Sequence, residues 1–337
     1  MRNVLNIFSD KKILIYGLGK SGISSYRFLK NKSDIYLFDD NLKINLKPKK
    51  KIVKLDLIQK INFDRIIISP GIDISNCKLS KFLKKNFSKI HTDLDVFCSF
   101  YNNKSITITG TNGKSTTCKL LFEVLNKHGL DVKLAGNIGF PILSIKNIKP
   151  KSIFVIEASS YQLDYSKLFY SKYGAILNIS VDHLERHRSL KNYISAKLKL
   201  FKNQKKGSLA FINKYDKNLK KEIKKNKYES KIIEVNTKLD KKFIDVFQNK
   251  YFQSISNREN LSFILAIAKH FKIKKKILIN VIKNFKGLNY RQQIIFSNKN
   301  ISVINDSKST SYSSSLEMLK SLKNIYWLLG GIPKKGD

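Results

Sequence analysis

The sequence predicts an α/β protein with a three-domain architecture: a first domain built on a parallel, Rossmann-like sheet, a central P-loop domain and an incomplete Rossmann-like third domain. Two glycine-rich turns, GLGKSG at 17–22 and TGTNGKST at 109–116, each follow a short apolar strand and open a helix. Strand, turn and helix in that order are typical of parallel α/β domains. The length of 337 residues, against roughly 150 residues per domain, also favours several domains.

Residues 1–95 are expected to form the first domain. Its strands are KILIY, DIYLFDD and RIIISPGI, and Gly17, Gly19 and Gly22 give the G-x-G-x-x-G spacing after the first of them. Asp39 follows about 20 residues later, as in dinucleotide-binding turns. An NAD-dependent oxidoreductase could use this turn, and so could a protein that places a uridine diphosphate sugar on the helix N-terminus. The P-loop-like turn at 109–116 favours the sugar nucleotide, because it predicts that the protein binds ATP and hydride transfer requires no ATP.

Residues 96–287 are expected to form the central domain. SITIT, SIFVIEASS, YGAILNIS and SLAFIN are its candidate buried strands, and Leu120, Leu121, Val124 and Leu125 have helical spacing. The lysine-dense stretch 202–242 has a weak apolar period, which predicts solvated helices and loops.

Residues 288–337 are expected to open a third domain. NISVINDS and IYWLLGG are predicted strands, with a helix at SSLEMLKSLK between them. Two strands and one helix cannot bury both faces of a sheet, so we expect this domain to be truncated at Asp337.

Composition excludes several classes. Hydrophobic residues are 42% and aromatic residues 11% of the chain, which excludes intrinsic disorder. Three cysteines without a CxxC pair argue against a disulfide framework and for a reducing compartment. No apolar run is long enough to span a membrane, so we expect a cytoplasmic protein without membrane contact.

The net charge is +40, which raises the question of a nucleic-acid partner. The excess is spread along the chain, is mostly lysine, and accompanies many Asn, Ile, Phe and Tyr residues, which share A/T-rich codons. No recognition motif accompanies it, so we expect no nucleic acid, with a basic nucleic-acid-binding P-loop protein as a competing hypothesis.

The segment Gly110–Thr116 is the most informative motif. A glycine loop between strand and helix directs backbone N–H groups at phosphate oxygens, Lys114 adds positive charge, and the Ser115 hydroxyl can bind Mg²⁺. The loop is two residues shorter than the usual P-loop, which would place glycine where Ile108 stands.

Other candidates are less specific. Glu157 ends the strand IFVIE, where a carboxylate can hold Mg²⁺ on a nucleotide or can serve as a helix cap. His183 follows the strand AILNIS and is compatible with a metal, a phosphate or a structural role. Arg186 and His187 are expected to be solvated, and Lys197, judged from its pattern alone, is expected on the surface.

The segment Asn305–Thr310 ends a predicted strand and precedes a helix. Asp306 and Lys308 there could contact a nucleotide or an acyl phosphate. They could equally form a plain N-cap with a neighbouring ion pair.

Taken together, the motifs resemble the Mur ligase family. The matching stretches, in the order that the family has them, are GLGKSG, SPGI, TGTNGKST, GNIGFP, EASSYQL, LNISVDHLERH, YISAKLKLF, NREN, YRQQ, NDSKST and LLGGIPKKGD. EASSYQL and the GLGKSG domain look like the branch of the family that adds D-glutamate. Two positions depart from the pattern: Ser256 stands before NREN, and Asn289 and Tyr290 stand before Arg291, where histidines are expected.

The resemblance implies a first domain for the uridine nucleotide, a central domain for ATP and a third domain for the amino acid. It implies ligation of D-glutamate to UDP-N-acetylmuramoyl-L-alanine through an acyl phosphate, with ATP as co-substrate, two Mg²⁺ ions, no other partner and a monomeric enzyme. Competing interpretations are an incomplete fragment that only binds UDP-sugar and ATP, and a folylpolyglutamate synthase-like ligase.

The resemblance also implies roles for individual residues. Near the uridine diphosphate and the muramoyl group it places Ser21, Asp39, Asp40 and Asn137. Around ATP it places Gly110, Thr111, Asn112, Gly113, Lys114, Ser115, Thr116, Asn260, Arg291, Asp306 and Lys308. The metal ligands it implies are Ser115, Glu157, His183 and a carbamylated Lys197, and it places Lys334 near D-glutamate. Lys114, His183 and Lys197 are then the catalytic candidates.

Overall fold

The computed structural model describes residues 6–41, 51–309 and 312–331. It confirms the α/β class. In the N-terminal part, a four-stranded parallel sheet has the order β2-β1-β3-β4. Its strands are β1 Lys12–Tyr16, β2 Asp34–Phe38, β3 Arg65–Ile68 and β4 Ile90–His91. Its helices are α1 Lys20–Leu29, α2 Leu55–Ile58, α3 Ser80–Lys85 and η2 Phe87–Lys89.

The middle of the chain forms a six-stranded parallel sheet in the order β10-β9-β8-β5-β7-β6. The strands are β5 Ser105–Thr109, β6 Val132–Gly136, β7 Ile153–Glu157, β8 Tyr173–Ile176, β9 Leu209–Asn213 and β10 Lys231–Val235. The strand that carries the glycine loop, β5, therefore lies between β7 and β8. Their carboxyl ends meet at one edge of the sheet, where open α/β sheets bind ligands.

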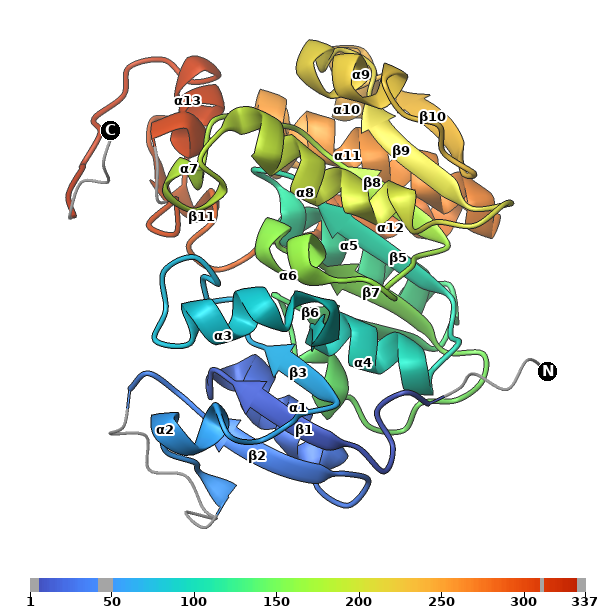
Figure 1. The fold of residues 1–337 in the computed structure, drawn as a ribbon. Coiled ribbons are helices and arrows are strands. Elements are labelled where there is room, and N and C mark those ends of the chain that lie inside the picture. Colours follow the sequence, from blue (N-terminus) through green and yellow to red (C-terminus); the bar gives the residue numbers. More distant parts are fainter. Residues whose placement is uncertain (1–5, 42–50, 310–311, 332–337) are drawn as a thin grey trace.

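Helices cover both faces of this sheet (Figure 1). They are α4 Asp93–Phe100, α5 Lys114–Lys127, α6 Ser160–Tyr165, α7 Leu184–His187, α8 Leu190–Lys202, α9 Lys217–Lys224, α10 Lys241–Asp245, α11 Ile255–Ala268 and α12 Lys275–Asn284. Three short 3₁₀ turns, η3 Ile142–Ser144, η4 Lys250–Gln253 and η5 Lys269–Phe271, complete this part.

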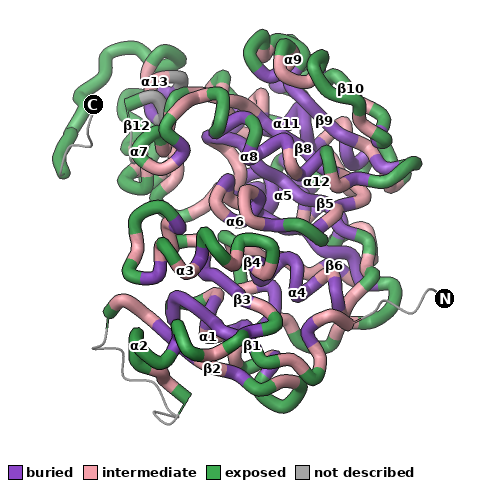
Figure 2. Tube along the Cα trace, viewed as in Figure 1, coloured by how far each residue is buried: buried purple, intermediate pink, exposed green. Residues whose placement is uncertain are grey.

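Successive side chains along the strands of the six-stranded sheet pack into two different hydrophobic cores, one on each face. Val155 of β7 packs with α5, α11 and α12, whereas its neighbours Phe154 and Ile156 pack on the other side with α4, α6 and α8. Successive side chains of a strand point to opposite faces, so a fully buried strand reads as a continuous apolar run. Figure 2 shows that the buried segments are concentrated in the four-stranded sheet, the six-stranded sheet and the helices that pack against them.

The second of these cores continues into the four-stranded sheet. Ile13 and Ile15 of β1 belong to the same cluster as Phe97 of α4 and Phe154 of β7, and the rings of Phe97 and Phe154 lie 4.7 Å apart. The helix α4 thus lies between the two sheets (Figure 1).

The C-terminal part departs from the prediction. β11 Gln293–Ser297 and β12 Ser302–Asn305 form an antiparallel pair, followed by α13 Tyr312–Lys320. The predicted strand at 325–331 is wrong. No other strand of the described residues lies beside it to share backbone hydrogen bonds, and Tyr326 and Leu328 are 98% and 97% exposed.

Several strands are additions to the prediction. The sequence did not indicate β4, β6 and β11, and β10 lies within 202–242, where only solvated helices and loops are expected. The sequence of β10, KIIEV, is short, and the lysine-rich segments on either side leave its three apolar residues without a recognisable strand pattern. The predicted domain boundaries stay predictions. Among the described residues, no helix is both long and apolar enough to cross a membrane.

Candidate active site

The glycine loop joins β5 to α5 as predicted. Gly110 and Gly113 both have positive φ, +153° and +80°. A Cβ on Gly113 would lie 2.0 Å from Asn260 Oδ1, so the buried Asn260 of α11 contacts the loop at the start of α5. The structure therefore brings Asn260, which is predicted to lie around ATP, to the predicted phosphate loop.

A residue outside the predicted set holds this loop in place. Asn178, just after β8, accepts a hydrogen bond from Asn112 N at 2.8 Å and donates one to Asn112 O at 3.2 Å. Its backbone oxygen accepts from Thr111 N at 3.0 Å. The signal present in the sequence is a polar side chain at the end of a buried strand.

Lys114 folds back over the loop. Its Nζ donates to Gly110 O at 3.0 Å and to Thr111 O at 2.6 Å. Burial lowers the pKa of Lys114, and the carboxylates of Glu157 and Asp182 oppose that shift. The ammonium group thus covers carbonyl oxygens at the place where the loop would receive phosphate.

Glu157 ends β7 beside the loop and is 1% exposed. Its Oε1 accepts from Asn137 Nδ2 at 3.0 Å, so two residues with different predicted roles are in contact. Its Oε2 is buried and has no hydrogen-bond partner among the described residues. An unpartnered buried carboxylate oxygen is costly, and it fits a position that a hard cation such as Mg²⁺ completes.

Lys197 is not on the surface, contrary to what its pattern alone predicts. It is 1% exposed, and its Nζ donates to Gly110 O at 2.9 Å and lies 4.4 Å from the ring centre of Tyr193. Burial, followed by the charge of Lys114, lowers the pKa of Lys197 well below its usual value. Tyr193, Lys197 and Phe201 recur every four residues, so the helical period contains a signal that the abundance of lysine conceals.

His183 lies in the left-handed region, with φ of 55°. Its Nε2 lies 3.4 Å from Asp182 Oδ2 and its Nδ1 lies 3.4 Å from Glu185 Oε1. No three His, Cys, Asp or Glu side chains of the described residues converge in a way that could hold a metal. Asp182, which also affects the pKa of both Lys114 and Lys197, is a charged neighbour outside the predicted set.

His187 is not solvated as predicted, and Arg186 is only partly exposed. The Arg186 guanidinium lies 4.3 Å from the Tyr161 ring centre and donates to Pro70 O and Ile72 O. His187 is 5% exposed, and its Nε2 lies 2.9 Å from Ser160 Oγ. None of these partners is visible in the sequence, because all four contacts join segments that are distant along the chain.

Two of the remaining predicted ATP residues, Arg291 and Asp306, follow α11 in the chain and lie near the loop. Arg291 lies near enough to affect the pKa of Lys114, and both Arg291 and Asp306 affect that of Tyr251, whose hydroxyl lies 3.4 Å from Thr116 Oγ1. Asp306 Oδ1 accepts from Gln292 N at 3.0 Å. Lys308 Nζ lies 5.8 Å from the Tyr290 ring centre.

The first glycine turn is a separate site. Asp39 accepts from Leu18 N at 2.5 Å and Asp40 accepts from the Tyr16 hydroxyl at 2.7 Å, so both carboxylates are hydrogen-bonded at the end of β1. The Ser21 hydroxyl donates to Asp93. Lys334 lies outside the described residues.

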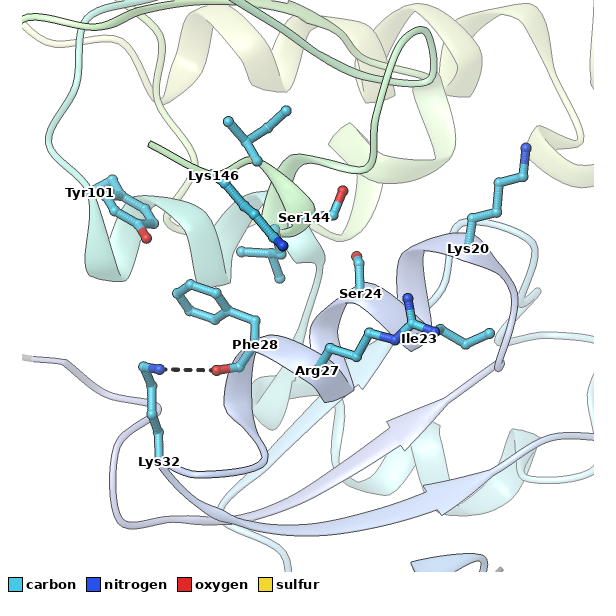
Figure 3. Close-up of a pocket in the computed structure, with 11 residues that line it drawn as sticks. Lys20, Ile23, Ser24, Arg27, Phe28, Lys32, Tyr101, Ser144 and Lys146 are labelled. Atoms are coloured by element: carbon cyan, nitrogen blue, oxygen red, sulfur yellow. Dashed lines mark hydrogen bonds between the residues drawn. The ribbon is translucent and has the colours of Figure 1, made fainter. Parts of the chain in front are cut away.

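A cavity of about 640 Å³ lies elsewhere, between α1 and η3 (Figure 3). Lys20, Arg27, Lys32 and Lys146 contribute its charges. Lys32 donates to Phe28 O at 3.1 Å. None of the residues predicted for the active site lines this cavity.

Comparison with known proteins agrees with the geometry. Residues 108–291 match the Mur ligase middle domain. The chain is 38% identical to the UDP-N-acetylmuramoylalanine--D-glutamate ligase of Rickettsia prowazekii, over 98% of this chain and 79% of that protein. It is 36% identical to the ligase of the same name from Buchnera aphidicola subsp. Schizaphis graminum, over 98% of this chain and 80% of that protein.

Solved structures show the same fold. The alanine ligase MurC of Thermotoga maritima has a TM-score of 0.53 and 18% identity, over 92% of this chain and 77% of that one. The MurF ligase of Thermotoga maritima, solved in complex with ADP, has a TM-score of 0.54 and 12% identity, over 94% of this chain and 75% of that one.

Proposed function

We propose that this chain, which belongs to the Mur ligase family, is an ATP-dependent ligase that adds D-glutamate to UDP-N-acetylmuramoyl-L-alanine in peptidoglycan precursor synthesis. The reaction type follows from the family, and the amino acid follows from the names of relatives at 38% identity. Residues 1–95 would bind the uridine nucleotide, 96–287 would bind ATP, and 288–337 would begin the amino-acid domain.

The observation that carries the proposal is the cluster at the carboxyl end of the central sheet. Lys114 and Lys197 both donate to Gly110 O, at 3.0 and 2.9 Å, and Glu157 influences the pKa of each. A glycine loop with the buried Lys197, the half-buried Lys114 and the buried carboxylate of Glu157 is suited to bind a triphosphate and to stabilise charge on a transferring phosphoryl group.

Two Mg²⁺ ions would supply charge stabilisation at the phosphoryl oxygens. Ser115, Glu157 and His183 would hold them, with Lys197 as a carbamate. The unpartnered Glu157 Oε2 supports a cation there. The lowered pKa of Lys197 supports carbamylation, because CO₂ adds to the neutral amine; the nitrogen then releases a proton to solvent, which leaves a carbamate ligand of charge −1.

The first step activates the carboxylate of the L-alanyl group. One of its oxygens attacks the γ-phosphorus of ATP, ADP leaves, and an acyl phosphate forms. Gly110–Thr116 would hold the phosphates through backbone N–H groups and Lys114, while Asn260, Arg291, Asp306 and Lys308 would hold the rest of the nucleotide. Asn137, which contacts Glu157, would orient the muramoyl substrate toward the γ-phosphate.

The second step forms the amide. The D-glutamate amine attacks the acyl carbon, loses a proton, and inorganic phosphate leaves with the carbon–oxygen bond pair. Ser21, Asp39 and Asp40 would keep the uridine diphosphate in place, and Lys334 would contact D-glutamate. We further propose a monomeric, cytoplasmic enzyme that has small molecules as its partners and does not bind nucleic acid.

Purified protein tests the proposal directly. With ATP and Mg²⁺, phosphate release should require both UDP-N-acetylmuramoyl-L-alanine and D-glutamate, and the product should gain one glutamyl residue by mass. L-glutamate, D-alanine and L-lysine serve as controls. Equal release with any of these amino acids, or release that ignores the UDP-sugar, contradicts the assignment.

A further inference from the structure

The candidate sites on the two sheets are joined by a buried carboxylate that neither contains. Asp93 is the first residue of α4 and is 3% exposed. Its Oδ2 accepts from the Ser21 hydroxyl, in the turn after β1, and its Oδ1 accepts from Gln162 Nε2 at 3.2 Å, on α6. One side chain therefore contacts the turn proposed for the uridine nucleotide and a helix of the central sheet.

Three hydrogen-bond donors hold the Asp93 side chain in place. Ser21 and Gln162 donate to it, and so does its neighbour Leu94 through the backbone N–H at 3.0 Å. A carboxylate is a pure acceptor and satisfies three donors at once. Burial raises the pKa of Asp93, and these three hydrogen bonds oppose that shift. Its place at the N-terminus of α4 also favours negative charge.

Gln162 also contacts the segment that follows Glu157, next to the proposed site of phosphoryl transfer. The side-chain Oε1 of Gln162 accepts a hydrogen bond from Ser159 N at 3.2 Å. The backbone N–H of Gln162 donates to Ser159 Oγ at 3.2 Å, and this pair of bonds caps α6. The cap begins two residues after Glu157, the end of β7. Because the amide oxygen is held by the cap, its nitrogen faces Asp93, and the orientation of Gln162 is defined at both ends.

We propose that Asp93 is a positioning residue of the ligase: through Ser21 and Gln162 it sets the place of the uridine-nucleotide turn relative to the Glu157 end of the central sheet. This inference rests on the proposed function. The acyl acceptor and the γ-phosphate must meet although their sites lie on different sheets, and small misplacements of reacting atoms are costly to rate.

A positioning role and a structural role differ in what they change. If Asp93 only stabilises the fold, its loss lowers thermal stability and leaves the rate per folded molecule unchanged. If it positions the two sites, each ligand still binds alone with nearly its usual affinity, and the transfer between them becomes slow.

The same helix offers a matched control. Asp95 is also buried and also accepts several hydrogen bonds, from Lys167 N, Leu168 N and Phe169 N at 3.0, 2.9 and 3.0 Å. These donors belong to the loop after α6 and contact neither proposed site. Asp95→Asn should therefore cost stability without slowing the folded enzyme.

The experiment measures ADP formed in the first turnover with ATP, Mg²⁺ and UDP-N-acetylmuramoyl-L-alanine and without amino acid, at a temperature where each variant is folded. Asp93→Asn keeps the size of the side chain and turns one acceptor into a donor. We expect its rate to fall by about 10–100-fold, while the dissociation constants of UDP-substrate and of Mg·ADP, each measured alone, change by less than about threefold.

A charge-swapped pair supplies the rescue. In the double variant Asp93→Asn, Gln162→Glu, the new amide can donate to the new carboxylate, which also keeps its bond from Ser159 N. The rate should recover most of the loss. If Asp93→Asn alone does not fold, this double variant carries the test, because a folded double variant that stays slow overturns the role.

Other outcomes are equally decisive. A folded Asp93→Asn enzyme with a rate within about threefold of wild type overturns the positioning role and leaves the ligase intact. An equal slowing in Asp95→Asn also overturns it, since the effect would then be general. A wild-type chain that forms no ADP in response to the UDP-substrate overturns the proposed function and this inference together.

Discussion

Gly113 offers a sharp test of the glycine loop, because the structure separates two costs of giving it a side chain. The first is backbone strain: at φ of +80°, an alanine costs about 1–2 kcal/mol. The second is a clash, since the new Cβ would lie 2.0 Å from Asn260 Oδ1 and 2.8 Å from Asn260 Cγ. Overpacking of this kind adds about 1–3 kcal/mol.

Gly129 is the matched control, at the other end of the same helix. It has φ of +92°, and no heavy atom lies within 4 Å of the place that a Cβ would take, so Gly129→Ala carries only the strain. The expected loss of unfolding free energy is about 1–2 kcal/mol for Gly129→Ala and about 2–5 kcal/mol for Gly113→Ala.

Urea denaturation measures the loss of unfolding free energy in both variants. The comparison is valid if the dependence of that free energy on urea concentration is the same in both variants and in the wild type. Titration with Mg·ADP should show weaker binding for Gly113→Ala alone, because the clash displaces the loop or Asn260. If the two variants lose the same stability and bind Mg·ADP equally well, then Asn260 does not contact the loop as described.

The remaining predictions concern the charged groups of the site. Lys114→Ala should abolish ATP-dependent turnover and leave the affinity for the UDP-sugar, measured by calorimetry, nearly unchanged; near wild-type turnover would remove Lys114 from the mechanism. Glu157→Gln and His183→Ala should each raise the Mg²⁺ concentration needed for half-maximal activity, and unchanged titrations in both would show that neither is a ligand. Lys197→Met should be inactive, with Lys197→Ala partly restored by acetate as a replacement ligand. Burial lowers the pKa of Lys197 in the folded chain below its ordinary value of 10.5. Between the two pKa values the unfolded chain binds more protons than the folded chain, so the free energy of unfolding of the wild type rises with pH in that range. The stability advantage of Lys197→Met, from urea denaturation at several pH values, should therefore shrink as pH rises, and a constant advantage would contradict the buried amine.

The sequence predicted the features that local chemistry determines. The order of strand, glycine loop and helix at β5 and α5 is confirmed, and so is the place of Glu157 at the end of β7. Such signals lie within a few residues of each other, so one sequence is enough to find them.

The sequence could not show contacts between distant segments. Lys197 resembles its neighbouring lysines until packing places it against Gly110, and Asp93 has no visible function until the fold brings Ser21 and Gln162 to it. The segment 325–331 has the composition of a strand, yet a strand also needs a neighbour to pair with.

The most direct test of the central claim follows an oxygen atom. UDP-N-acetylmuramoyl-L-alanine with ¹⁸O in the alanyl carboxylate is incubated with the protein, ATP, Mg²⁺ and D-glutamate, and the released nucleotide and phosphate are analysed by mass. An acyl phosphate transfers one labelled oxygen to inorganic phosphate, and ADP stays unlabelled. Amide formation with unlabelled phosphate, or with label in AMP, would contradict the account.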